Sequence, residues 1–225
     1  MEEGGYQNHG EISLANYGVL FLDEFTEFDK NVIEVLRAPI EDGKITISRV
    51  NSSITYPSKF MLVAAMNPCP CGYYGSEVRE CKCTDTLIKK YLSKVSGPLL
   101  DRIDIQVEVP QIKYEKINDN KVETSAQIKK RVNRARKIQI ERYKQDNIYN
   151  NDSLTPKLMK KYCKLDYDTG KLLEKAFNNL KLSMRAYGRI IKVARTIADL
   201  EESKDIQKKH IAEAIGYRVL DKNYF

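Results

Sequence analysis

An apolar run that ends in two adjacent acids constrains this chain more than any other feature. The run is "GVLFLDEF", residues 18–25, and its apolar part stops at Asp23 and Glu24. A short apolar run of this kind predicts a buried strand of a parallel sheet, and open α/β sheets bind ligands beyond the carboxyl ends of such strands. Two abutting acids there favour a phosphate-and-magnesium site about as much as a solvated turn.

The composition is that of a globular protein. The chain has 225 residues, of which 42% are hydrophobic and 31% are charged, which is enough for one large domain or two small ones. No apolar stretch is long enough to cross a bilayer, and the N-terminus lacks the basic start and apolar centre of a signal peptide. We therefore expect no membrane partner and a cytoplasmic location.

Charge is unevenly spread along the chain. Residues 1–118 hold 13 Lys and Arg against 17 Asp and Glu, a net of −4, which leaves 25 against 14, or +11, for residues 119–225. The basic part can meet a polyanion such as DNA, although a solvated basic helical surface with no partner is comparably common.

The pattern of elements changes near residue 118. The first part alternates strand-like and helical runs, which predicts an α/β domain with an inserted hairpin. Its runs are "GVLFL", the helical "NVIEVLRAPIEDG", the hairpin "KITISRV" and "SSITYPS" with "NSS" at the turn, "KFMLVAAMNP" and "DIQVEVP".

The second part, residues 119–225, reads as helices. The segment 125–144 carries eight Lys or Arg, with an apolar stripe of Ile128, Val132, Ala135 and Ile138. Further on, Thr155 precedes a proline at the first position of another predicted helix.

Four cysteines lie close together in the sequence as two Cys-x-Cys pairs: Cys69, Cys71, Cys81 and Cys83. Four clustered thiols favour a tetrahedral Zn²⁺ site. The single residue between paired cysteines is tighter than the usual two, so free thiols or a redox disulfide stay open. Cys163, the fifth, fits a small core residue.

Five segments in order carry a family resemblance: "GVLFLDEF", the hairpin, "LVAAMNP", "SGPLLDRID" and "LSMRAYGR". Together they resemble the C-terminal portion of a magnesium-chelatase-like AAA+ ATPase of the ComM/YifB type. The resemblance implies a partial AAA+ parallel-sheet core over 1–118 with a pre-sensor 1 β-hairpin, followed by an α-helical lid over 119–225. It also implies ATP and Mg²⁺ as cofactors, a hexameric ring of identical subunits, and DNA remodelling as in branch migration.

The resemblance assigns roles around the nucleotide. Asp23 matches the Walker B acid that holds Mg²⁺ through water, and Glu24 the acid that activates the attacking water, as hydrolysis beside a γ-phosphate requires. Asn67 matches sensor 1, although an Asn before Pro68 can equally cap a turn. Arg102 matches the arginine finger that reaches a neighbouring subunit, although alone it would more often form a surface ion pair with Asp101 or Asp104.

Two further assignments follow from the same resemblance. Arg185 matches the sensor 2 arginine of the lid, acting on its own or on the neighbouring subunit's nucleotide. Lys44 and Arg49 lie on the hairpin that touches DNA in related hexamers, and two basic residues on an exposed hairpin are otherwise unremarkable.

One expected motif is not in the sequence. No "GxxxxGK[ST]" occurs, because Gly170 and Lys171 have Leu165 and Leu172 where the motif needs glycine and a hydroxyl. We expect a fragment of a longer ATPase that is inactive alone. The alternatives are a noncatalytic assembly or nucleic-acid-binding module, and a magnesium-chelatase subunit, which the cysteine pairs after "NP" disfavour because they occur in the ComM branch.

Overall fold

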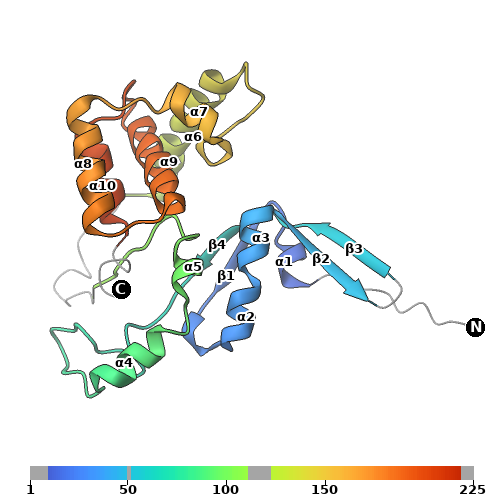
Figure 1. Ribbon diagram of the computed structural model, residues 1–225, viewed down its shortest axis with the longest axis vertical. Coiled ribbons are helices and arrows are strands. Elements are labelled where there is room, and N and C mark those ends of the chain that lie inside the picture. Colours follow the sequence, from blue (N-terminus) through green and yellow to red (C-terminus); the bar gives the residue numbers. More distant parts are fainter. Residues whose placement is uncertain (1–9, 50–51, 111–122, 219–225) are drawn as a thin grey trace, which may run out of the picture. The chain divides into compact units, whose positions relative to one another are not determined.

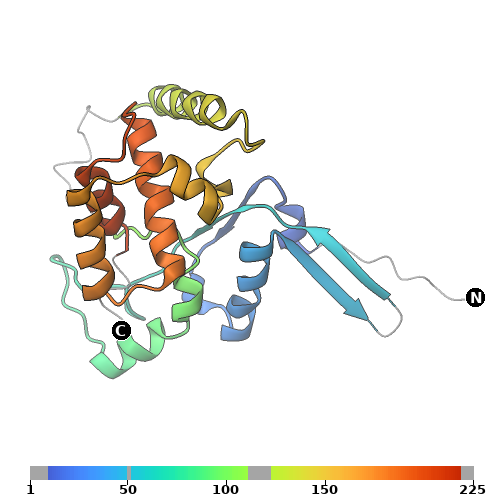
Figure 2. The same cartoon turned by 45° about the horizontal axis from the view of Figure 1, so that its top comes forward.

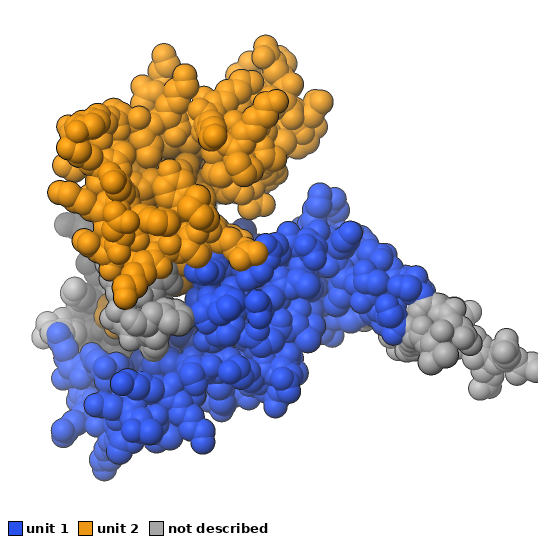
Figure 3. Space-filling view, viewed as in Figure 1, with its two compact units in different colours: residues 1–102 blue, residues 103–225 orange. Residues whose placement is uncertain are grey.

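The structure is a computed structural model that describes residues 10–49, 52–110 and 123–218. It divides into two compact units, residues 1–102 and 103–225, which Figure 3 colours separately. The sequence-based boundary at residue 118 lies outside the described residues.

A two-stranded parallel sheet organises the first unit. Strand β1 (Val19–Leu22) pairs in parallel with β4 (Met61–Ala64), and Phe21 lies opposite Val63 (Figure 1). The predicted parallel strand is therefore confirmed, but its predicted burial is wrong. Val19 and Phe21 are each 59% exposed because nothing in the described chain covers that face.

The other elements of this unit, besides a hairpin, are short helices: α1 (Glu11–Leu14), α2 (Lys30–Val35), α3 (Arg37–Asp42), α4 (Asp85–Leu92), α5 (Gly97–Leu100) and the 3₁₀ turn η1 (Phe25–Glu27). The single helix expected over residues 31–43 is two helices. Pro39 lacks the N–H that a continuous helix needs, and the chain breaks at Leu36 one turn earlier. Gly43 ends α3 at φ 63°.

The hairpin consists of β2 (Lys44–Arg49) and β3 (Ser52–Pro57), paired antiparallel (Figures 1 and 2). Arg49 lies opposite Ser52, so the expected "NSS" turn is wrong in part: its serines belong to β3. One face carries hydroxyl pairs, with the Oγ1 atoms of Thr46 and Thr55 2.9 Å apart.

The second unit is helical, as expected. It contains α6 (Ser125–Tyr143), α7 (Pro156–Tyr162), α8 (Tyr167–Asn179), α9 (Met184–Leu200), α10 (Lys208–Gly216) and the 3₁₀ turn η3 (Asn151–Ser153). Thr155 caps α7 as predicted, accepting a hydrogen bond from the N–H of Leu158. Helix α9 packs against α6 and α10, and its buried side supplies six of the 14 buried residues of the core cluster.

Two expectations for this unit are wrong. The predicted strand at residues 104–110 is reduced to one bridge between Gln106 and Arg218, since no other described strand lies there to pair with. The stripe on α6 is also shifted. Ile128 and Val132 are exposed, because only the C-terminal half of the helix packs inward, through Ala135, Gln139 and Tyr143. Within the described ranges, every helix is too short or too polar to span a bilayer.

Candidate functional site

The two acids lie directly beyond the carboxyl end of β1, as predicted. Asp23 and Glu24 are both exposed, and Asp23 Oδ1 accepts a 2.8 Å hydrogen bond from the N–H of Glu24. Glu24 adopts a left-handed backbone, φ 49° and ψ 43°, which is uncommon for a residue with a side chain and often marks a functional position. The turn is anchored by the buried Phe25, whose N–H donates to the carbonyl of Ala65 at 2.8 Å.

Asn67 lies beyond the neighbouring strand at the same edge of the sheet. Strand β4 ends at Ala64, so Asn67 is three residues further along and not in the strand itself. Its side chain is exposed. Because β1 and β4 are parallel and in register at Leu22 and Ala64, the structure brings the acids and this amide to one edge.

Arg102 is buried, with 8% exposed, and not on the surface. Its guanidinium contacts the carboxylate of Glu41 on α3 and donates to the carbonyl of Pro98 at 2.7 Å. The surface ion pair with an adjacent acid, weighed from sequence, is therefore wrong in both partner and setting. The pairing with Glu41 was missed, because 61 residues separate the two and neither spacing nor motif links them.

Arg185 occupies the first turn of α9, after the cap Ser183, and is exposed. Two of the basic residues further along the helix, Arg189 and Lys192, are held within the second unit. Arg189 pairs with Asp104, and Lys192 donates to the carbonyl of Asp152.

The hairpin residues begin and end β2. Lys44 opens the strand and is exposed. Arg49 closes it, and its side chain lies outside the described part.

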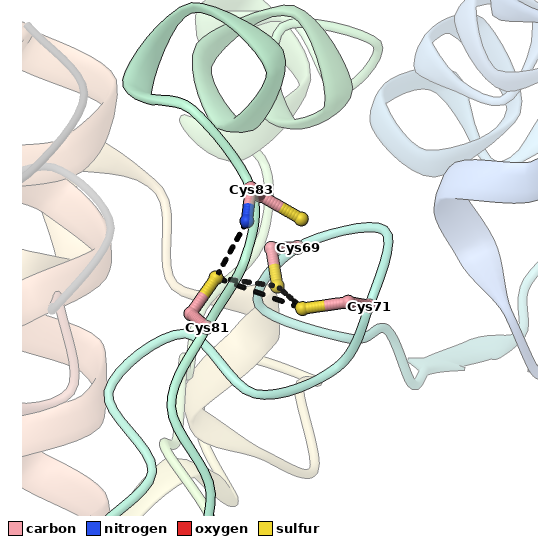
Figure 4. A group of neighbouring side chains, drawn as sticks. All are labelled: Cys69, Cys71, Cys81 and Cys83. Atoms are coloured by element: carbon pink, nitrogen blue, oxygen red, sulfur yellow. Dashed lines mark hydrogen bonds between the residues drawn. The ribbon is translucent and has the colours of Figure 1, made fainter.

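The four cysteines converge, as Figure 4 shows, and their sulfur atoms all lie within 4.8 Å of one another. A hydrogen bond from the backbone N–H of Tyr73 lowers the pKa of the Cys71 thiol to about 6. The backbone N–H of Cys83 acts the same way on Cys81, but desolvation and the neighbouring thiols outweigh it and raise the pKa of Cys81 to about 12. Desolvation also raises the pKa of Cys83. Repulsion between thiolates thus limits how many of the four cysteines are ionised together, unless a bound cation offsets their negative charge.

Comparisons with known proteins match both units. The profile described as "Magnesium chelatase, subunit ChlI" matches residues 3–117, and "Magnesium chelatase, subunit ChlI C-terminal" matches residues 122–218. The chain belongs to the magnesium-chelatase-like AAA+ family.

The curated relatives that match most of this chain include a ComM and a YifB protein. The chain is 47% identical to "Competence protein ComM" of Haemophilus influenzae over 94% of its length and 41% of the relative. It is 44% identical to "Uncharacterized protein YifB" of Salmonella typhimurium over 95% and 41%. "Magnesium-chelatase subunit ChlI" of Chlorella vulgaris matches at 36% over 26% of this chain and 17% of the relative. The chain thus spans about two fifths of the length of the first two relatives.

The residues present fit half of the ATP and Mg²⁺ site that membership of the magnesium-chelatase-like AAA+ family implies. Exposed carboxylates and an amide at one sheet edge are the hard oxygen donors that hydrated Mg²⁺ prefers. The phosphate cradle is not among them, because the Gly170–Lys171 pair lies inside helix α8 and not in a loop before a helix.

Proposed function

We propose that the carboxyl edge of β1 and β4 is the water-activating half of an ATP site, in a ring-forming ATPase that remodels DNA. The observation that carries this is the backbone of Glu24. Glu24, two residues after the end of β1, has a left-handed backbone. Both acids are exposed at the edge of the sheet beyond which Asn67 follows β4.

Each residue takes one role at this edge. Bound ATP would supply the reacting γ-phosphate, and Mg²⁺ would offset its negative charge. Asp23 would hold a water of the hydrated ion, Glu24 would orient the attacking water and take its proton, and the Asn67 amide would contact that water and the γ-phosphate. All three are exposed, so they can meet a ligand without rearrangement of a core.

Arg102 is proposed to act on the nucleotide of a neighbouring subunit. To do so its guanidinium must leave Glu41 and the carbonyl of Pro98. In this proposal these two contacts keep Arg102 away from the nucleotide until subunits assemble into a ring. Arg185, in the first turn of α9, is proposed as the lid's contact with phosphate.

DNA is proposed as the partner on two grounds: the similarity to ComM and YifB, and the basic residues of the hairpin. The ComM and YifB relatives match over 214 and 215 residues, whereas the Chlorella ChlI subunit matches over 59. Lys44 and Arg49 are the first and last residues of hairpin strand β2, and both are proposed to contact DNA phosphates. The double change Lys44→Ala/Arg49→Ala should lower the slope of log binding constant against log salt concentration by about 2 in magnitude. Lys160→Ala on α7 is the control and should leave that slope less affected. An unchanged slope in the double variant would show that the hairpin does not contact DNA.

Hydrolysis tests the site most sharply. ATP binding and turnover are measured for the 225-residue chain and for a version extended by the in-frame upstream coding sequence. In the active version, Glu24→Gln should keep nucleotide binding and abolish turnover, whereas Glu11→Gln, an exposed acid on α1, should leave turnover unchanged. Normal hydrolysis by the Glu24 variant would remove it from catalysis.

A mixing experiment separates action within a subunit from action between subunits. Arg102→Ala should also abolish turnover. A ring made from equal amounts of the Arg102→Ala and Glu24→Gln chains regains intact sites at about a quarter of its interfaces, because one chain supplies the acid and its neighbour the finger. Activity that stays at zero on mixing would contradict the trans role.

A further inference from the structure

The segment between β4 and α4 has no apolar core of its own. From Ala65 to Thr84 it contains no helix or strand, and among these described residues only Cys69 is buried. Ordered segments of this length without secondary structure are uncommon and are usually functional. Some interaction other than hydrophobic packing must therefore hold the segment in shape.

The sulfur positions fit a single ion. Cys69 Sγ lies 3.3 Å from Cys71 Sγ and 3.7 Å from Cys81 Sγ, and the last two sulfurs are 3.6 Å apart. Tetrahedral bonds of ~2.3 Å from zinc to sulfur place the sulfurs about 3.8 Å apart. A disulfide needs about 2.05 Å, and an iron–sulfur cluster stands between its cysteines and spreads their sulfurs further.

The backbone explains how paired cysteines separated by one residue can share an ion. Gly72 follows the first pair at φ 79°, and its N–H donates to the carbonyl of Cys69 at 3.0 Å. This turn folds Cys71 back beside Cys69. In the second pair, the N–H of Cys83 donates to the Sγ of Cys81 at 3.4 Å, which fixes the turn between these two cysteines.

We propose that Cys69, Cys71, Cys81 and Cys83 bind one structural Zn²⁺ that takes the place of a core for this segment. The ion joins the chain just after β4 to the chain just before α4 through four bonds. Its four protein ligands leave no open position for a substrate, which makes the site structural and not catalytic. Metal binding then contributes directly to the folding of this unit.

The location gives the ion a second consequence, which rests on the proposed function. Cys69 follows Asn67 by two residues, and a Cβ placed on Gly72 would lie 4.0 Å from Asn67 Oδ1. The zinc loop therefore runs beside the proposed sensor. Loss of the ion would release the loop and, with it, the position of the amide at the sheet edge.

Zinc content of the 225-residue chain tests the proposal without reference to ATP. After purification in reductant, plasma mass spectrometry should find about one zinc per chain. The double variant Cys71→Ser/Cys83→Ser should lose it. The control Cys163→Ser, at a buried thiol in the second unit, should keep it.

A second measurement covers the case in which the double variant does not fold. Wild-type chain stripped with a chelator should melt at least ~5 °C lower and recover on adding Zn²⁺ alone. One equivalent of Co²⁺ should give the thiolate charge-transfer band and the visible band of a tetrahedral site. A chain with neither zinc nor a Co²⁺ band, with a disulfide by intact mass, or with iron and sulfide, overturns the proposal. Failure of ATP hydrolysis leaves each of these readouts unaffected.

Discussion

The two units of this chain are built on different principles. The second unit has an extensive core in which Ile190 and Ile211 are at most 1% exposed and helices α8, α9 and α10 pack together. The first unit has a two-stranded sheet with one apolar face open, and a segment fixed around four thiols. The proposed nucleotide residues at the sheet edge lie on the unit with less support of its own. The proposed site therefore has less hydrophobic support than the helical unit, so its position depends more on the segment that the four cysteines hold together.

The largest effect is expected in the second unit, at a buried polar network around Asp199. This carboxylate is fully buried and accepts hydrogen bonds from Arg142, Arg195 and Asn151, with distances of 3.0, 3.1 and 3.0 Å. Burial opposes charge on Arg142, yet its bonds to Asp199 raise the pKa of the guanidinium.

Asp199→Ala should therefore cost about 3–5 kcal/mol in the free energy of unfolding, because it leaves buried cations without their partner. Urea unfolding followed by circular dichroism measures the loss. The exposed Asp205→Ala is the matched control and should change it by less than ~0.5 kcal/mol. A loss of similar size in both variants would contradict the special role of the network.

The sequence predicts local features of both units well. The apolar run of β1, the Thr155–Pro156 start of α7 and the convergence of four nearby cysteines follow from residues close in the chain. Prediction from sequence fails where a residue contacts a partner that is far away along the chain. Which half of α6 packs inward depends on α9, Arg102 finds Glu41 from another helix, and the Asp199 network joins three separate elements. The exposed face of β1 was mispredicted because apolar composition alone does not tell which faces are covered.

A smaller effect on stability is expected at Asp146 in the second unit, and it should depend on pH. Hydrogen bonds from Tyr162 and Lys161 lower the pKa of Asp146 below its ordinary value of 3.8. A carboxyl group with a depressed folded pKa stabilises the fold above its unfolded pKa, and this stability is lost as pH falls through the folded one.

The melting-temperature advantage of wild type over Asp146→Asn should accordingly be constant from pH 7 to about pH 5 and shrink below about pH 4. The Asp205→Asn control should show no such convergence with wild type. An advantage that persists unchanged at low pH would show that packing, and not charge, accounts for the effect of Asp146.

The smallest loss in the free energy of unfolding is expected on the open apolar face of the sheet in the first unit. Phe21 lies opposite Val63, and with Val19 and Met61 these side chains form an exposed apolar surface on paired strands. Phe21→Ser removes little buried area, so it should change the free energy of unfolding by less than ~0.5 kcal/mol.

The same change should reduce self-association of the 225-residue chain, measured by sedimentation velocity, because an open apolar face and unpaired strand edges favour contact between chains. Leu20→Ser is the matched control: it lies one residue earlier, on the half-buried opposite face, and should destabilise the fold. If Phe21→Ser unfolds the chain as much as Leu20→Ser does, both faces of β1 are packed, and the first unit is as self-sufficient as the second. If only association changes, the open face is the surface through which copies of this chain contact one another.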